Sequence, residues 1–261
     1  MIKISVIVTT YNRPKLLKET LDSILNQTYV NFELIVVDNN SNYDFFNFLK
    51  SFNDSRIKAY QNENNGIIAV NRNFGIKKAK GKYIAFCDDD DIWIQSKLEV
   101  QLKQIEKNRK DIISSNISVF EKNLNTILFN SKSSKPRNIY DLLWLNKIYT
   151  STVLVKNSDL LFFNEDPNLI TVEDYELWIK LMFNGCKFDF TDQNLIYYRK
   201  AQTGAYLKSS KNRNIKLIYL FKTILKKKIN FIQYLFVLFL ILNQLLRFSV
   251  KTLKNIFKKK S

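Results

Sequence analysis

The chain has 261 residues, 46% of them hydrophobic, with a formal net charge of +17 and no histidine. The absence of histidine excludes histidine-based catalytic triads, histidine general bases and the usual zinc sites, so acid–base chemistry falls to Asp, Glu, Lys, Tyr or Cys. Two cysteines predict no disulfide framework, and the first residues resemble a strand rather than a signal peptide, so we expect a reducing cytosolic setting.

Positive charge is concentrated near the carboxyl terminus. Residues 207–261 hold 14 Lys or Arg and no Asp or Glu, which leaves 27 basic and 24 acidic side chains in the preceding 206 residues. A nucleic-acid binder would interleave basic and aromatic residues over a folded face. This distribution instead marks the terminal segment as a separate functional part and argues against a nucleic-acid partner.

The first half of the chain alternates predicted strands and helices. Apolar runs rich in Ile and Val predict strands at 3–9, 32–37, 56–60 and 82–86. Helical spacing and turn signals predict helices at 14–25, at 43–52 and from just after Gly66 to about residue 78. This order predicts an α/β fold with a mostly parallel, Rossmann-like, doubly wound sheet flanked by helices.

Four consecutive carboxylates, Asp88 to Asp91, follow the strand predicted at 82–86. Adjacent like charges repel, and a divalent cation would relieve that repulsion. Clustered oxygen ligands favour magnesium, manganese or calcium over zinc. A solvated acidic turn is the alternative interpretation.

Polar residues follow two other predicted strands. Thr9 to Asn12 comes after the first strand, and Asp38 to Ser41 comes after the second. The carboxyl ends of parallel strands share one edge of a sheet, where ligands usually bind, so these loops and the acidic run can line one crevice. Tyr11 could stack on a base, and Asp38 or Asn39 could hydrogen-bond a base or ribose. Ordinary turn chemistry explains each loop equally well on its own.

Five motifs in order resemble the family 2 glycosyltransferases with the GT-A fold, over roughly residues 2–199. The motifs are Thr9-Thr10-Tyr11-Asn12, Asp38-Asn39-Asn40-Ser41, the segment 65–75 with Arg72-Asn73-Phe74-Gly75, the Asp-x-Asp segment in 81–93, and Glu173-Asp174. The resemblance implies an inverting transferase that moves a sugar from a nucleoside diphosphate donor to a glycan or lipid-linked acceptor. It also implies a cofactor, Mn²⁺ or Mg²⁺.

The resemblance also assigns roles to residues. It implies Asp90 as the metal ligand and Asp174 as the base that deprotonates the acceptor hydroxyl. It implies that seven residues contact the nucleotide: Thr9, Tyr11, Asp38, Asn39, Arg72, Asp88 and Asp89. Asp174 also suits the first turn of a helix whose N-cap is Thr171, where carboxylates are common for structural reasons.

Two departures from the family pattern bear on the ligands. Asn39 stands where relatives often place a second Asp that contacts the base, so a UDP-linked donor is the first expectation and dTDP or another nucleotide stays open. Some relatives add a late metal-binding His after a Tyr-Arg pair, and Tyr198-Arg199-Lys200 supplies none. The metal would then depend on Asp90, phosphate oxygens and water.

The second half is less regular. We predict strands at 111–120 and 150–155, a hairpin or mobile loop at 121–136 and a short helix at 140–144. The expected organisation is a catalytic domain at 1–206, with a nucleotide-binding half at 1–95 and an acceptor half at 96–206, followed by a tail at 207–261. Trp144, Tyr149 and Trp178 could stack on a sugar or simply pack in the core.

The tail combines basic and apolar segments. Residues 208–228 read as a basic helix, and residues 229–246 form an uncharged run of about 27 Å if helical, which is marginal for a bilayer core. Asn230, Gln233, Gln244 and Arg247 give this run a weak polar stripe. We therefore expect helices lying in the anionic cytoplasmic surface of the bacterial inner membrane, in the service of surface polysaccharide or lipooligosaccharide synthesis. A spanning helix, a helix packed on the catalytic domain, and a non-catalytic nucleotide- or membrane-binding protein with a degenerate site are the alternatives.

Overall fold

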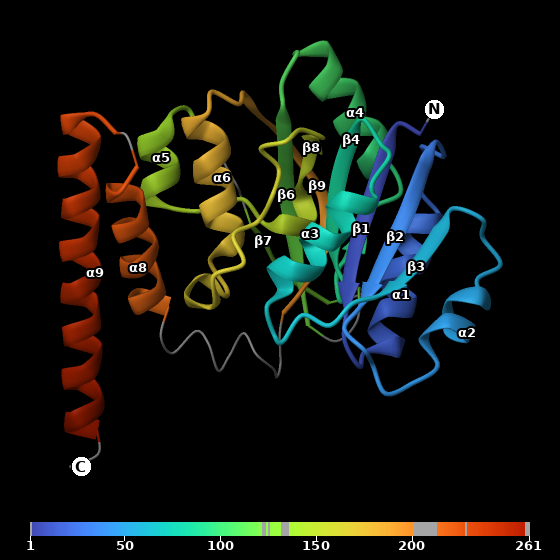
Figure 1. The fold of residues 1–261 in the computed structure, drawn as a ribbon, viewed down its shortest axis with the longest axis horizontal. Helices are drawn as coiled ribbons and strands as arrows, with labels where there is room; N and C mark the ends of the chain where they lie inside the picture. The colour runs from blue at the N-terminus through green and yellow to red at the C-terminus, as the bar shows by residue number, and fades with distance from the viewer. Residues whose placement is uncertain are drawn as a thin grey trace.

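A computed structural model describes residues 2–121, 124, 126–131, 136–200, 213–227 and 229–258, the stretch 248–258 by its backbone only. Within these residues one nine-stranded sheet has the strand order β3-β2-β1-β4-β8-β6-β9-β5, and β7 pairs with β6. Figure 1 shows helices on both faces of this sheet, with the two C-terminal helices at the far side from the N-terminus.

The amino-terminal half is a parallel sheet. Strands β1 (Ile4–Thr10), β2 (Phe32–Asp38), β3 (Ile57–Gln61) and β4 (Tyr83–Asp88) pair in parallel, in the order β3-β2-β1-β4. The connecting helices are α1 (Pro14–Leu25), α2 (Phe45–Lys50) and α3 (Ile68–Lys78). The four strands and three helices predicted here are confirmed, with shifts of a few residues at their ends.

Alternation along the strands explains why the core has two layers. Val6 and Val8 of β1 join one apolar cluster, and Ile7 between them joins the other, because successive side chains point to opposite faces. Helix α1 covers the first face, and α3 covers the second. A Cβ on Gly75 of α3 would lie 2.6 Å from Cγ2 of Ile7, so glycine is what lets this helix approach β1.

The second half departs from the predicted parallel pattern. Its elements are β5 (Ile92–Trp93), α4 (Lys97–Lys107), β6 (Ile112–Phe120), β7 (Ile127–Ser131), α5 (Ile139–Trp144), β8 (Leu154–Lys156), α6 (Glu173–Phe183) and β9 (Phe188–Arg199). Strand β8 runs antiparallel to both β4 and β6, although β6 and β9 are parallel. The sheet is therefore mixed.

Two local predictions for this half can be compared with the structure. A strand at 150–155 is wrong at its start, where the 3-10 turn η1 (Thr150–Thr152) precedes β8. A second 3-10 turn, η2 (Pro167–Leu169), precedes α6. In the segment predicted as a hairpin or mobile loop at 121–136, residues 127–131 form β7, which pairs antiparallel with the preceding strand β6. Residues 122, 123, 125 and 132–135 lie outside the described residues.

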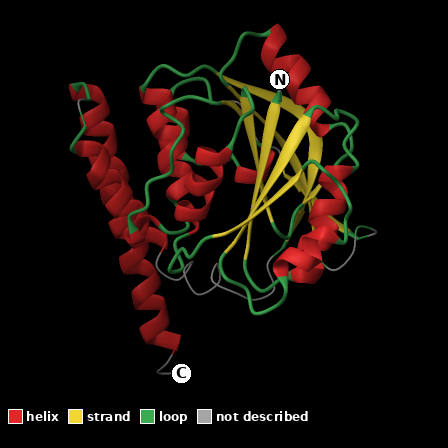
Figure 2. Cartoon of the chain, turned by 45° about the vertical axis from the view of Figure 1, so that its right-hand side comes forward, coloured by secondary structure: helices red, strands yellow, loops and turns green. Residues whose placement is uncertain are grey.

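The tail forms two helices, α8 (Arg213–Leu225) and α9 (Phe231–Lys258), and Figure 2 shows the long α9 along one side of the molecule, away from the strands. Leu220 of α8 and Val237 of α9 are buried in the same apolar cluster as residues of α6, so these two helices pack on the rest of the fold. Gln244 of the predicted polar stripe is buried too. Within the described residues, no helix combines the length and the apolar character that a bilayer-crossing segment needs. Residues 201–212, which include the predicted boundary at 206, are not described.

Candidate active site

A cavity of about 320 Å³ lies where β1 and β4 end, on the side of the sheet that faces α3 and α6. Its wall combines six segments: the ends of β1, β4 and β9, the start of α3, the turn η1 and the entry to α6. The lining residues are Thr9, Arg13, Gly66, Ile68, Arg72, Asp88, Asp89, Asp90, Tyr149, Thr150, Ile170, Thr171, Glu173, Asp174, Tyr198 and Arg199. The structure thus brings together Thr9, Arg72, the acidic run and Asp174, as the sequence predicts.

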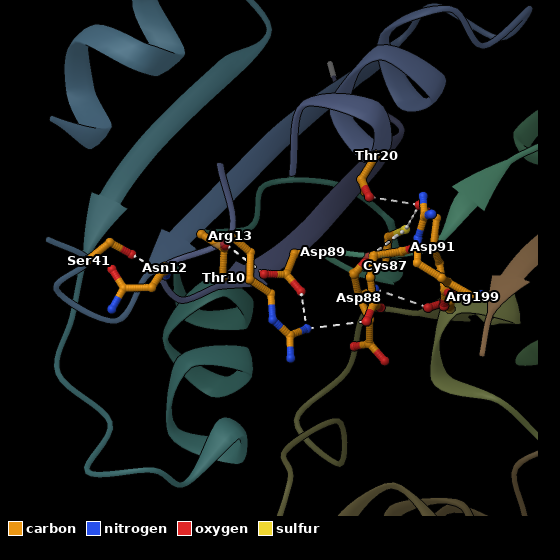
Figure 3. A network of polar contacts seen from close by, with 12 residues as sticks. Thr10, Asn12, Arg13, Thr20, Ser41, Cys87, Asp88, Asp89, Asp91 and Arg199 are labelled. Atoms are coloured by element: carbon orange, nitrogen blue, oxygen red, sulfur yellow. Dashed lines mark hydrogen bonds and ion pairs between the residues drawn. The ribbon is translucent and has the colours of Figure 1, made fainter. Parts of the chain in front are cut away.

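Arginine side chains and hydroxyls hold the acidic run. Oδ2 of Asp89 accepts a hydrogen bond from Thr10 Oγ1 at 2.7 Å, and its Oδ1 lies 3.1 Å from Nη1 of Arg13. The same Nη1 lies 3.2 Å from Oδ2 of Asp90. Asp91 points away from the cavity and accepts from the backbone N–H of Arg199 at 3.1 Å. Figure 3 shows Arg13 reaching toward Asp89 and Arg199 beside Asp91.

Burial and mutual repulsion raise the pKa of two carboxyls of this run, Asp89 and Asp90. Burial, followed by the charges of Asp88 and Asp89, raises the pKa of Asp90 to about 7. Burial also raises the pKa of Asp89, against the opposing effect of Arg13. A cation bound here would relieve the repulsion among the ionised carboxylates and favour their charged forms.

Arg72 connects the acidic run to α6. Its Nη2 lies 2.8 Å from Oδ1 of Asp88, and its Nη1 lies 2.9 Å from Oε1 of Glu173. The guanidinium also faces the ring of Phe163 at 5.2 Å from its centroid. Burial works to lower the pKa of Arg72, but Asp88 and Glu173 more than offset it, so the pKa lies above its usual value. Arg72 is a fully buried cation between the two halves of the site.

Asp174 lies in the first turn of α6. Its Oδ2 accepts from Thr150 Oγ1 at 3.3 Å, and its Oδ1 accepts from the backbone N–H of Tyr175 at 2.6 Å. Burial, and then the charge of Glu173, raises its pKa to about 7, with Arg72 acting in the opposite direction. A carboxylate with such a pKa can accept a proton near neutral pH.

Thr171 does not cap α6. The residue at the N-cap position is Val172, which gives no side-chain cap, and Thr171 has a φ of +77°. Thr171 as the N-cap is therefore wrong, whereas Asp174 does lie in the first turn of α6, as its second residue, and lines the cavity. A β-branched residue with positive φ is strained, which places that strain at the cavity wall.

The turn η1 supplies two hydroxyls to the site, and the prediction of a strand at 150–155 missed both of them. Thr150 contacts Asp174, as described above. The hydroxyl of Ser151 accepts a hydrogen bond from the backbone N–H of Asp88 at 3.0 Å. Adjacent residues of η1 thus contact the acidic run and Asp174. The signal in the sequence was the run of small hydroxyl residues Thr150-Ser151-Thr152, which a strand would have pointed to alternate faces.

Three of the predicted nucleotide contacts lie beside the cavity rather than on its wall. Tyr11 is exposed after β1. Asp38 is fully buried and accepts hydrogen bonds from the backbone N–H of Ser41 at 2.8 Å and from Gln61 at 3.0 Å. Asn39 accepts from the backbone N–H of Asn64 at 2.8 Å. These contacts fasten neighbouring loops together, and a role in nucleotide binding stays a prediction for all three.

The residues present fit a hard divalent cation only in part. Within the described part of the chain, no three Asp, Glu, His or Cys side chains are grouped to hold a metal. Asp88 and Asp90 both line the cavity, with side chains 34% and 25% exposed. One or two protein oxygens would then hold the ion, and donor phosphates and water would complete its coordination, as magnesium commonly requires.

The aromatic residues divide between core and surface. Trp178 is in the core, which excludes it from sugar stacking. Tyr149 lines the cavity, with its ring 5.2 Å from that of Tyr198. Trp144 is exposed and lies outside this cavity, stacked on Phe239 of α9.

Comparisons with known proteins agree with this geometry. The model of the family "Glycosyl transferase family 2" matches residues 5–169. An uncharacterized glycosyltransferase of Methanocaldococcus jannaschii is 34% identical over 87% of this chain and 81% of its own length. The Escherichia coli UDP-Glc:alpha-D-GlcNAc-diphosphoundecaprenol beta-1,3-glucosyltransferase WfaP is 33% identical over 75% of this chain and 76% of its own length.

Two solved structures show the same fold. Staphylococcus aureus TarS 1-349 in complex with UDP-GlcNAc superposes with a TM-score of 0.72 at 22% identity, over 93% of this chain and 72% of that one. The mannosyltransferase PcManGT of Pyrobaculum calidifontis, in complex with GDP-Man and Mn²⁺, gives 0.64 at 19% identity, over 91% and 68%. The expected GT-A fold, with a mostly parallel sheet flanked by helices, is confirmed, although the sheet also contains antiparallel pairs.

Proposed function

Since this chain belongs to the family 2 glycosyltransferases, we propose that it transfers a sugar, with inversion, from a UDP-linked donor to a lipid-linked glycan acceptor. The setting we propose is bacterial surface polysaccharide or lipooligosaccharide synthesis. The observation that carries the proposal is that Asp174 and the acidic run Asp88–Asp90 face one cavity. The activity of the relative WfaP, described above, supports the donor and acceptor classes.

The donor belongs at the acidic end of the cavity. Arg13 and Arg72 both line it, and their positive charge would stabilise the leaving diphosphate. Thr9, which also lines the cavity, has a hydroxyl that could donate a hydrogen bond to the donor. Mn²⁺ or Mg²⁺ held by Asp90, with Asp88 beside it, would add positive charge where negative charge develops on the phosphate oxygens. Asp89, tied to Thr10 and Arg13, holds the turn in place.

The acceptor belongs beside Asp174. Its pKa of about 7 suits a base that removes a proton from a hydroxyl at neutral pH. The deprotonated oxygen attacks the anomeric carbon, the bond to the diphosphate breaks, and the electron pair leaves with the nucleoside diphosphate. A single displacement of this kind inverts the anomeric centre.

The location we propose is the cytoplasmic face of the bacterial inner membrane, with α9 lying in the anionic interface. The support is the outward face of α9, where apolar side chains are exposed in a row: Phe231, Ile232, Leu235, Phe239, Leu242 and Leu246. The 14 basic residues of the tail would add attraction to anionic lipid. Two signals of this kind generally suffice for stable attachment.

The direct test is transfer by the full-length protein. UDP-linked sugars are offered one at a time, with Mn²⁺, to an acceptor in which N-acetylglucosamine is linked through a diphosphate to a polyprenyl chain. Mass spectrometry should show a product one sugar heavier for at least one donor. Binding of nucleotide sugars without transfer to any acceptor would favour the alternative, a non-catalytic nucleotide-binding protein.

A further inference from the structure

A second cavity, of about 500 Å³, lies outside the catalytic one. Among the residues that the structure describes, its lining comes from the segment 136–148, which contains α5. Four of its lining residues are exposed at the surface, namely Arg137, Trp144, Leu145 and Lys147. Two are cations and two are large apolar side chains, so this wall presents positive charge next to apolar surface.

One carboxylate tempers the positive charge. Asp141 also lines the cavity, and its Oδ2 lies 3.1 Å from Nε of Arg137. The described lining residues therefore include two cations, Arg137 and Lys147, and one anion. That balance favours an anionic ligand, and the adjoining tryptophan and leucine favour one with an apolar part.

The apolar side of this cavity meets the exposed face of α9. The ring of Trp144 stacks on that of Phe239, with centroids 6.3 Å apart and planes 8° apart. Phe239 belongs to the row of exposed apolar side chains on α9. Trp144 thus joins the cavity to the surface that we assign to the membrane interface.

The other side adjoins the catalytic cavity. Lys147 lines the second cavity, while Tyr149 and Thr150 line the first. Three residues of extended chain span at most about 10 Å, so the two cavities flank one short segment. A ligand with its anionic group near Lys147 could place an attached sugar in the catalytic cavity.

We propose that the cavity of segment 136–148 binds the diphosphate and the first prenyl units of the lipid-linked acceptor. The prenyl chain would continue over Trp144 to α9 and the bilayer, and the sugar would enter the catalytic cavity beside Asp174. This inference rests on the proposed function for its acceptor class. Its physical basis is the match of an anionic head and an apolar chain to adjoining cationic and apolar walls.

Tryptophan fluorescence of the full-length protein tests the site without any transfer. Trp144 is 54% exposed, whereas Trp93 and Trp178 are 2% and 0% exposed, so Trp144 reports selectively on this cavity. Adding farnesyl diphosphate should change the fluorescence emission of Trp144, and the change should saturate as the ligand concentration rises. Farnesol and inorganic diphosphate should bind at least about tenfold more weakly, because each lacks one of the two contacts.

Charge variants give the control. Arg137→Ala with Lys147→Ala should weaken farnesyl diphosphate binding at least about tenfold. Lys103→Ala with Lys107→Ala, exposed on α4, removes the same charge and should leave binding unchanged. Asp141→Asn removes the anion from the cavity wall and should tighten binding. Equal weakening by both double variants, or no response of Trp144 in the wild type, would overturn the assignment.

The result separates this site from the proposed function. If the protein binds farnesyl diphosphate but transfers no sugar, the proposed lipid site stands and the proposed transferase function is wrong. If the protein transfers sugar to a lipid acceptor, and the Arg137→Ala, Lys147→Ala double variant has an unchanged KM for that acceptor, the transferase function stands and the proposed lipid site is wrong. Self-association that Leu145→Glu abolishes, with Trp144 silent to farnesyl diphosphate, would identify the surface as an interface between two copies and contradict the proposal.

Discussion

Arg72 and Glu173 form a buried ion pair, with Nη1 and Oε1 2.9 Å apart, between side chains that are 5% and 9% exposed. Arg72 comes from α3, which follows the loop at the end of β3, and Glu173 begins α6. Because Asp174 follows Glu173 directly, this pair fixes the helix that carries the proposed base against the half of the sheet that carries the acidic run.

Arg72→Met should destabilise the protein by about 3–5 kcal/mol, since it leaves Glu173 buried without its cationic partner. Urea unfolding at pH 7 measures the change in the free energy of unfolding. Lys18→Met is the control, because it breaks the exposed pair with Asp22 and should cost less than about 1 kcal/mol. Equal effects of the two variants would mean that the Arg72 pair contributes no more than a surface contact.

Metal-assisted donor binding should depend on Asp90. Asp90→Ala removes the carboxylate that lines the cavity beside Asp88 and should abolish the gain in UDP-sugar affinity that Mn²⁺ gives the wild type. Calorimetry with manganese and with chelator measures both affinities, and circular dichroism checks the fold. Asp22→Ala, on the exposed face of α1, should keep the full gain. If the gain persists in Asp90→Ala, the metal is held elsewhere.

The order of strands and helices up to Asp88 followed from the sequence because buried parallel strands and their helices have strong periodicity. The antiparallel insertion of β8 between β4 and β6 did not, since nothing local in Leu154–Lys156 encodes a partner or direction. For the same reason the sequence predicts a strand where the structure has η1. Its conformation is set by contacts with distant residues, among them Asp88 and Asp174.

The site was predictable where chemistry is concentrated in a few residues. Asp88–Asp90, Arg72 and Asp174 meet in one cavity, as the motifs imply. The sequence did not reveal Arg13 as a partner of Asp89, because that pair spans β1 and β4 and needs their register. Nor did it reveal that the side-chain oxygens of Asp38 and Asn39 accept hydrogen bonds from neighbouring segments of the chain.

The activity should fall at acid pH with a midpoint near the pKa of Asp174, about 7. Only the carboxylate can accept the hydroxyl proton, so kcat/KM should drop about tenfold per pH unit below the midpoint. Thr150→Val removes a donor to this carboxylate and should move the midpoint upward, and Thr150→Ser should restore it. An identical profile in all three proteins would mean that Thr150 does not tune the base.

Stability should show the opposite dependence. The folded protein keeps the proton of Asp174 up to about pH 7, whereas an unperturbed Asp loses it near 3.8. Its contribution is therefore complete at low pH and is lost as pH rises through about 7. Between pH 5.5 and 8, the free energy of unfolding should fall less in Asp174→Asn than in the wild type.

Membrane attachment should depend on the outward face of α9. Ile232→Glu with Leu242→Glu places charge on this exposed face and should release the protein from anionic liposomes in a flotation gradient. Val30→Glu with Phe46→Glu changes two exposed apolar residues elsewhere and should leave flotation intact. High salt should weaken attachment only in part, because apolar burial is not screened. If the wild-type protein does not float with anionic liposomes, α9 does not bind the membrane interface and the proposal is wrong.

The central claim is that Asp174 is the base of a sugar transfer whose donor lies at the acidic run. Single-turnover transfer from a UDP-sugar to the diphosphate-linked acceptor, compared between wild type and Asp174→Asn, tests it most directly. The account predicts unchanged donor affinity and a rate at least about 100-fold lower in the variant. A variant that transfers sugar at the wild-type rate would contradict it.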